Sequence, residues 1–134
     1  MSDLKFLLNS QEKFQRFSGN NFEEMSVEEK SKYMKEHGYF LIEETIEMLR
    51  ELPYHKSWKD YSTLTPGQLI YQKNLAKEES IDMLHFMINI FLCLGMDEKE
   101  IIDMYKEKNK INYDRQNDSD LGYIQEALSS DIEE

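Results

Sequence analysis

The chain has only five glycines and two prolines in 134 residues. Because these two residue types are the main breakers of helices, their scarcity leaves long uninterrupted stretches. The stretches are rich in Glu, Lys, Leu, Met and Ile, and we find in them no alternation of apolar and polar residues of the kind that marks a half-buried strand. The sequence therefore predicts an all-α fold, a bundle of four to five helices with four main ones.

Capping and breaking residues set the expected helix ends. Pro53 stops the second helix, the pair Thr65-Pro66 starts the third as an N-cap followed by proline at the first helical position, and Gly95 ends it. Gly38 is either a break in the second helix or a weak point within it. The second and fourth helices open on capping boxes, Ser26 with Glu29 and Asp97 with Glu100. The expected helices span 3–17, 27–52, 66–94 and 98–116.

The remaining segments are short. We expect residues 53–65 to form an ordered loop, and residues beyond Gly122 to form a brief amphipathic segment followed by a frayed acidic tail. The length suits one domain over residues 1–134, with 124–134 as its C-terminal segment.

The charge balance restricts the ligands. With 27 acidic and 16 basic side chains, the net charge is -11, which argues against binding DNA or RNA through phosphates. An anionic ligand would therefore need a cation as intermediary.

The cysteine content, the first residues and the hydropathy of the chain all favour a cytoplasmic location. The single cysteine, Cys93, excludes an internal disulfide, and the first residues lack a signal-peptide pattern. The most apolar stretch, 81–96, is too short and too polar to span a bilayer. We predict a cytoplasmic protein, in the host cytoplasm if it is viral, without a membrane partner.

A stripe of polar residues, which we call the polar seam, runs along one face of the third expected helix. Segment 81–94 of this helix is apolar nearly all round, which predicts burial on every side. Polar residues three or four positions apart nevertheless stack on one face. These are Glu78 or Glu79, Asp82, His85 and Asn89. A solvent-facing stripe is the alternative, but the apolar neighbours of the seam favour a functional site.

The second helix carries a matching acidic cluster: Glu43, Glu44, Glu47 and Glu51. Three of them share one face, where like charges repel unless a cation compensates. Two antiparallel helices that each present Glu-x-x-Glu or Glu-x-x-Asp would gather four carboxylates, which suits Mg2+ or Mn2+.

A di-iron site is disfavoured. Asp82-x-x-His85 supplies one half of such a site, but Met34 stands three residues before His37 and Leu52 three before His55. His85 therefore either hydrogen-bonds a carboxylate or ligand, or is a structural core histidine.

The fourth helix presents a cationic face. Tyr105, Lys108, Asn112 and Arg115 share one side of it and can donate many hydrogen bonds. The alternative is an ordinary solvated C-terminal turn with basic residues that complement the helix dipole. Together with the acidic clusters, this face suits a metal-chelated polyphosphate.

In these motifs the chain resembles the all-α nucleoside triphosphate pyrophosphohydrolases (MazG-like), and within them the dimeric dUTPase-like branch of phages and bacteria. The similarity covers about 11–123. The matching pieces are Glu44-Thr-Ile-Glu47, His55-Lys56-Ser57-Trp58-Lys59, Glu79-Ser-Ile-Asp82-Met-Leu-His85-Phe86, Lys108-Asn109 with Asn112, Arg115-Gln116, and Tyr123.

The resemblance implies a chemistry and an assembly. It implies Mg2+, two ions per site with Mn2+ as a possible substitute, held by Glu44, Glu47, Glu79 and Asp82. It also implies hydrolysis of a nucleoside triphosphate to the monophosphate and pyrophosphate, and a homodimer whose active site is completed near the subunit interface.

The resemblance also assigns the remaining roles. Glu47 is the candidate for orienting or deprotonating the attacking water, and Trp58 is a candidate wall of the pocket. Gln11 occupies the place where related dUTPases use a glutamine near the uracil edge, although Phe14 stands where some members have an asparagine. The candidates for gripping phosphate oxygens are Lys108, Asn112 and Arg115, with Lys56 or Lys59.

The predicted function is Mg2+-dependent hydrolysis of a deoxynucleoside triphosphate, with dUTP as the first choice of substrate. The same chemistry on dCTP or another nucleotide is the close alternative, because base choice depends on a few pocket contacts. A non-catalytic helical interaction protein is the alternative from another class. It would place the four acidic side chains on separate solvent faces.

Overall fold

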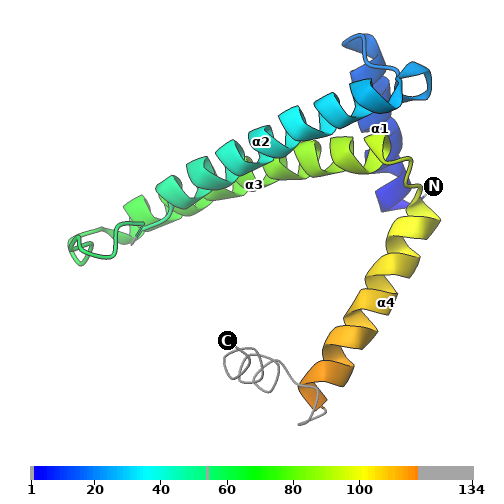
Figure 1. Cartoon of the computed structure of the whole chain (residues 1–134). Coiled ribbons are helices and arrows are strands. Elements are labelled where there is room, and N and C mark those ends of the chain that lie inside the picture. The colour runs from blue at the N-terminus through cyan, green and yellow to red at the C-terminus, as the bar shows by residue number, and fades with distance from the viewer. Residues whose placement is uncertain (1, 54, 118–134) are drawn as a thin grey trace, which may run out of the picture. The chain divides into compact units, whose positions relative to one another are not determined.

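The computed structural model describes residues 2–53 and 55–117, and over them the chain is all-α, as predicted (Figure 1). Within these ranges there are four α-helices, one short 3-10 helix and no strand. They are α1 (Asp3–Phe17), η1 (Phe22–Glu24), α2 (Val27–Glu51), α3 (Pro66–Cys93) and α4 (Glu98–Asn117).

The helix starts follow the predicted signals. Thr65 and Gln68 form a complete capping box on α3, with the Thr65 hydroxyl accepting from the Gln68 amide at 3.2 Å and the Gln68 side chain accepting from the Thr65 amide at 2.8 Å. Asp97 accepts from the Glu100 amide at 2.9 Å at the start of α4. Side-chain caps thus satisfy backbone N–H groups that have no partner within the helix.

α1 ends at Phe17 as expected, and the other three helices end within one residue of the expected position. α2 and α3 end at Glu51 and Cys93, because Leu52 and Leu94 are the capping residues that follow them. Gly95 has a φ of +74°, a conformation that glycine adopts without steric cost. Gly38 does not break α2, which runs through it without interruption.

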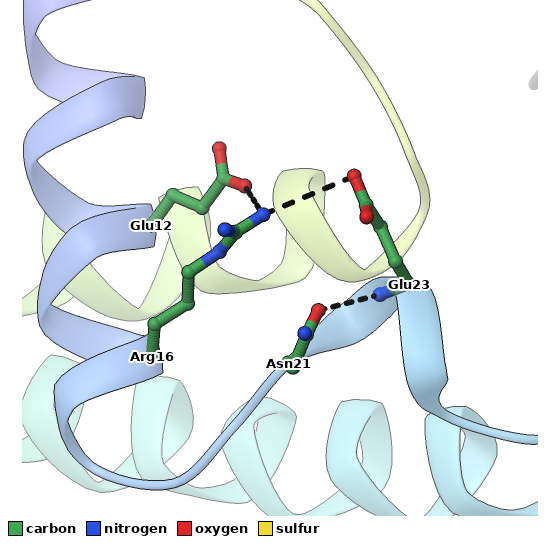
Figure 2. Close-up of polar contacts among 4 residues, drawn as sticks. All are labelled: Glu12, Arg16, Asn21 and Glu23. Atoms are coloured by element: carbon green, nitrogen blue, oxygen red, sulfur yellow. Dashed lines mark hydrogen bonds and ion pairs between the residues drawn. The ribbon is translucent and has the colours of Figure 1, made fainter.

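The short helix η1, which follows the turn after α1, was not predicted from the sequence. Asn21 caps it by accepting from the Glu23 amide at 3.2 Å. Figure 2 shows the side chain of Arg16, which belongs to α1, extending toward Glu23 of η1. Its guanidinium lies 2.9 Å from Glu12 and 3.8 Å from Glu23. These side chains are well exposed, so the ion pairs contribute little to stability.

The chain divides into two compact units, 1–96 and the residues from Asp97 on. In the first, α2 and α3 run antiparallel side by side and α1 packs on α3 (Figure 1). The pairing follows from contacts such as the Cys93 thiol with the Lys30 carbonyl and Ser80 with Met48. The second contains α4. The single domain stays a prediction, and residues 124–134 lie outside the described residues.

The core of the first unit lies where η1 meets α2 and α3. The ring of Phe22 meets that of Tyr33 edge to face, with 5.0 Å between centroids, and Cys93 is buried beside them. Burial raises the pKa of the Cys93 thiol, and the Cys93 sulfur lies 3.6 Å from the Lys30 carbonyl oxygen. These contacts fix the ends of α2 and α3 against one another.

The prediction that 81–94 is buried on every side is wrong for this chain. Ile81 is 54% exposed and Leu84 is 39% exposed. The reason is geometric, because the neighbours in the first unit are α2 and α1, and two helices cover only part of the circumference of a third. Part of α3 therefore leaves apolar surface uncovered.

Among the described residues, no single helix is long and apolar enough to cross a membrane. α3 and α4 taken together as a broken span meet the requirement by length and composition only.

Candidate functional site

A cavity of about 480 Å³ lies among α1, α2 and α3. Its walls combine aromatic rings with amides, imidazoles and two carboxylates, the mixture expected where a small molecule is held by a few oriented polar groups. The lining residues are Ser10, Gln11, Phe14, Gln15, His37, Glu44, Asp82, His85, Phe86 and Asn89.

One part of this cavity is a chain of hydrogen bonds that joins the three helices. The Gln11 Nε2 donates to Asn89 Oδ1 at 2.8 Å, and Asn89 Nδ2 lies 3.2 Å from His37 Nδ1. Asn89 is 2% exposed, so both halves of its amide need these partners. We call these three residues the amide chain.

Aromatic rings hold the imidazole of His37. It stacks on Tyr33 with 3.8 Å between centroids, and it contacts the edges or faces of Phe40 and Phe86 at 5.3 and 5.7 Å. Burial lowers the pKa of His37, so the ring is neutral near pH 7 and can accept the amide hydrogen at Nδ1.

The other part of the cavity borders a group of three carboxylates. Glu44 comes from α2, and Glu79 and Asp82 come from α3; each offers an oxygen within 4.8 Å of the others. Glu44 and Asp82 also line the cavity. The antiparallel pairing of the two helices therefore brings together the two acidic motifs. We call these three residues the carboxylate group.

The electrostatics of this group differ from those of an ordinary surface. The pKa of Glu44 is raised to about 7, first by a hydrogen bond shared with Glu79, then by burial and by the negative charges of Glu47 and Asp82. Two carboxylates can share a hydrogen bond only if one of them holds a proton, because ionised carboxylates are acceptors alone. The group thus gains from a proton or a cation.

Two oxygens in the group receive no hydrogen bond when both carboxylates are ionised. They are Oε2 of Glu44 and Oε2 of Glu79, which are buried and have no donor among the described residues. Buried carboxylate oxygens without a donor are costly, and carboxylate oxygens are the ligands that hard divalent cations prefer. The residues present therefore fit a divalent cation.

Glu47 stands apart from the other three expected ligands. It is exposed on α2, and its negative charge helps to raise the pKa of Glu44. It offers no atom to the group of three. The choice between Glu78 and Glu79 falls on Glu79, since Glu78 is exposed and outside the group.

Other predicted site residues lie in the cavity, on the connection between α2 and α3, and on α4. Gln11 and His85 line the cavity. Lys56, Trp58 and Lys59 lie on the connection between α2 and α3, where the Lys56 ammonium is 5.9 Å from the Trp58 ring and none of the three lines the cavity.

The cationic face belongs to α4 in the second compact unit. Its residues are Tyr105, Lys108, Asn112 and Arg115, and Tyr105 is 70% exposed. Tyr123, which the resemblance included, lies outside the described residues.

Sequence reasoning missed the role of His37. It considered this residue only as a metal ligand, whereas the ring belongs to the amide chain. The available signal was the spacing of Tyr33, His37 and Phe40, which share one face of a helix. Asn89 was recognised in the polar seam but was not assigned to a site.

No protein-family model matches the chain, and no solved structure matches it. Two curated relatives match part of it, the proteins named dCTP pyrophosphatase of Enterobacteria phage T4 and of Enterobacteria phage LZ5. Each is 47% identical over 47 residues, which are 35% of this chain and 26% of the relative. The match therefore spans about a quarter of the length of these relatives.

Proposed function

We propose that this chain is a pyrophosphohydrolase that converts a deoxynucleoside triphosphate to its monophosphate and pyrophosphate, with dCTP as the preferred substrate. The observation that carries the proposal is the convergence of Glu44, Glu79 and Asp82 at the edge of a cavity that can hold a base. The partial relatives named dCTP pyrophosphatase favour cytosine over uracil. dUTP remains the second candidate.

The carboxylate group is the proposed Mg2+ site, with Mn2+ as a possible replacement. Glu44, Glu79 and Asp82 would hold the ion, and a second ion would recruit Glu47 as well. When bound, Mg2+ supplies positive charge that neutralises a triphosphate and makes a coordinated water more acidic.

The chain's own residues would position the reactants. Glu47, exposed beside Glu44, can accept a proton from a water that attacks phosphorus. The cavity, which Phe86, Glu44 and Asp82 line, would hold the base against Phe86 and place the phosphates near the two carboxylates.

Four basic residues and one amide are proposed to hold phosphate oxygens. They are Lys56, Lys59, Lys108, Arg115 and Asn112. Trp58, 78% exposed in the connection after α2, is proposed to cover the substrate as a wall of the pocket. Lys and Arg are suited to this task because phosphate recognition rests on charge-assisted hydrogen bonds.

The alternative of a non-catalytic interaction protein is less well supported. It expects separate solvent-facing carboxylates, whereas the carboxylate group has two buried oxygens without donors. Such an arrangement raises the energy of the free protein unless a proton or a cation compensates for it.

A homodimer is part of the proposal, and exposed apolar side chains support it. Ile42 and Ile46 on α2 are 55% and 43% exposed, and Ile81 and Leu84 on α3 are also exposed. Exposed apolar patches of this kind mark association surfaces. Light scattering coupled to gel filtration should give twice the mass of one chain, and Ile81→Lys should shift the protein toward one chain.

The functional proposal is tested with a panel of deoxynucleoside triphosphates and Mg2+. Each is incubated with the protein, and the nucleotide products are separated by anion exchange. We expect the monophosphate to form fastest from dCTP, and we expect Glu47→Gln to lower the rate by at least about a hundredfold. Absence of turnover with every substrate, or full activity of the Glu47→Gln variant, would contradict the proposal.

A further inference from the structure

We infer that the hydrogen bonds from His37 through Asn89 fix the orientation of the Gln11 amide and thereby make the site prefer cytosine to uracil. This inference rests on the proposed function and assigns a part of it to residues that do not touch the phosphates. His37 and Asn89 are positioning residues in this account, and Gln11 is the group that contacts the base.

The donor-to-acceptor direction of the amide chain is described from the imidazole of His37. The neutral ring of His37 has one nitrogen that accepts, and Nδ1 is the atom that lies 3.2 Å from Asn89 Nδ2. The structure places the amide nitrogen of Asn89 toward the ring and its oxygen the other way, an arrangement that makes Nδ1 the accepting nitrogen of the neutral imidazole. That oxygen lies 2.8 Å from Gln11 Nε2.

This direction leaves a defined group free on Gln11. The nitrogen is committed to Asn89, and no hydrogen bond in the described part of the chain uses Gln11 Oε1. Because Gln11 lines the cavity, its oxygen can accept a hydrogen bond from a ligand there. The second hydrogen of Nε2 remains as a neighbouring donor.

An acceptor at this place distinguishes the two pyrimidines. Cytosine carries an amino group, a donor, on the ring carbon where uracil carries a carbonyl oxygen, an acceptor. Gln11 Oε1 attracts the amino group of cytosine and repels the carbonyl oxygen of uracil. If Asn89 were reversed, Oε1 of Gln11 would be used by Asn89 and only donors would face the base, which would favour uracil.

The structure around the chain opposes such a reversal. Asn89 is 2% exposed, so its amide can turn and keep both partners only if the His37 ring changes tautomer and the Gln11 amide turns with it. His37 is held by stacking on Tyr33 and by contact with Phe86, which also lines the cavity. The orientation of the Gln11 amide is thus set by residues on two other helices.

The test compares the ratio of kcat/KM for dCTP to that for dUTP in matched variants. Wild type should prefer dCTP by roughly tenfold or more, the discrimination expected of a site built around a polar contact. His37→Phe keeps an aromatic ring but removes the acceptor, and Asn89→Leu removes the link. Both should lower the ratio to about 1 to 3, with a smaller effect on kcat for dCTP.

Two further variants separate positioning from a structural role. Asn89→Asp keeps an acceptor toward Gln11 and should retain the ratio within about twofold. Asn74→Leu makes the same change as Asn89→Leu at an exposed position of α3 outside the cavity and should leave the ratio unchanged.

A double-mutant cycle gives the final check. Gln11→Leu, at a half-buried position on α1, should abolish the preference, and adding His37→Phe to it should change the ratio no further. If His37→Phe or Asn89→Leu fails to give a cooperative thermal transition, Gln11→Leu and Asn89→Asp still decide the question.

The possible outcomes are distinct. Turnover of dUTP equal to or faster than that of dCTP, or a ratio unchanged in His37→Phe and Asn89→Leu, overturns this inference while the proposed function stands. Loss of preference in Asn89→Asp equal to that in Asn89→Leu also overturns it. Absence of turnover of any triphosphate contradicts the proposed function itself.

Discussion

The two sides of the cavity show opposite ways of placing polar groups in an apolar setting. In the amide chain, Asn89 is almost fully buried and both of its polar atoms have partners. In the carboxylate group, Glu44 and Glu79 are only half-buried, yet each has an oxygen without a donor. The first arrangement is satisfied in the free protein, and the second is not.

Under the proposed function, this difference separates a side that stabilises the fold from a side that binds a cation. A satisfied buried network specifies a single packing and is costly to break. A group of like charges with missing donors destabilises the free protein and gains when a cation binds. Changes on the two sides should therefore have opposite effects on stability.

Neutralising one member of the carboxylate group should produce the largest effect, and it should be on activity. Glu79→Gln is expected to lower Mg2+-dependent turnover of dCTP by roughly a hundredfold or more, because it removes a charged ligand. The free energy of unfolding without metal should stay the same or rise, since repulsion with Glu44 is relieved. Steady-state kinetics and urea titration measure the two quantities.

The adjacent Glu78→Gln is the matched control for that change. Glu78 is exposed on the same helix and lies outside the carboxylate group. Its substitution should alter turnover by less than about twofold. Equal losses in the two variants would mean that overall charge, and not the carboxylate group, governs activity.

Breaking the amide chain should produce the largest loss of stability. Asn89→Leu leaves Gln11 and His37 without their partner and is expected to lower the free energy of unfolding by about 1–3 kcal/mol. Asn74→Leu, exposed on α3, should change it by less than about 0.5 kcal/mol. A stability of Asn89→Leu equal to that of Asn74→Leu would remove the contrast between the two sides.

The pH dependence should follow the carboxylate side. The pKa of Glu44 is raised from 4.5 to about 7, so between these values the folded protein binds more protons than the unfolded chain. The contribution to stability is present at low pH and is lost as pH rises through about 7. This contribution to the melting temperature of the metal-free protein should therefore fall as pH rises through about 7, and Glu44→Gln should lack this fall.

Added Mg2+ should reverse that trend. It binds the ionised carboxylates, so the rise in melting temperature that it causes should grow between pH 5 and pH 8. An equal rise at both pH values, or an equal rise in Glu44→Gln, would show that the ion acts elsewhere.

The smallest effect should come from a polar contact outside both sides. Arg16→Ala removes the exposed contacts with Glu12 and Glu23 and is expected to cost about 0.5 kcal/mol or less (Figure 2). Urea titration measures this change. A cost as large as that of Asn89→Leu would contradict the distinction between buried and exposed polar contacts.

Local signals predicted much of the fold and part of the site. Proline at 53 and 66 and glycine at 95 limit α2 and α3 because these residues act through their own backbone. The pairing of Glu44 with Glu79 and Asp82 followed from helical spacing and from the antiparallel arrangement of neighbouring helices. These features depend on few long-range details.

The remaining features depend on how the helices pack. The meeting of Gln11, His37 and Asn89 requires the register of three helices at once, which is set by side-chain packing around Tyr33 and Phe86. The exposure of Ile81 depends on how many neighbours cover α3. η1 was missed because a single turn has too few residues to show a period.

The most direct test of the central proposal is phosphorus NMR of dCTP incubated with the protein, with and without Mg2+. We predict signals of dCMP and pyrophosphate in the sample with Mg2+ and unchanged dCTP in the sample with a chelator. Products identified as dCDP and phosphate, or unchanged dCTP in both samples, would contradict the account.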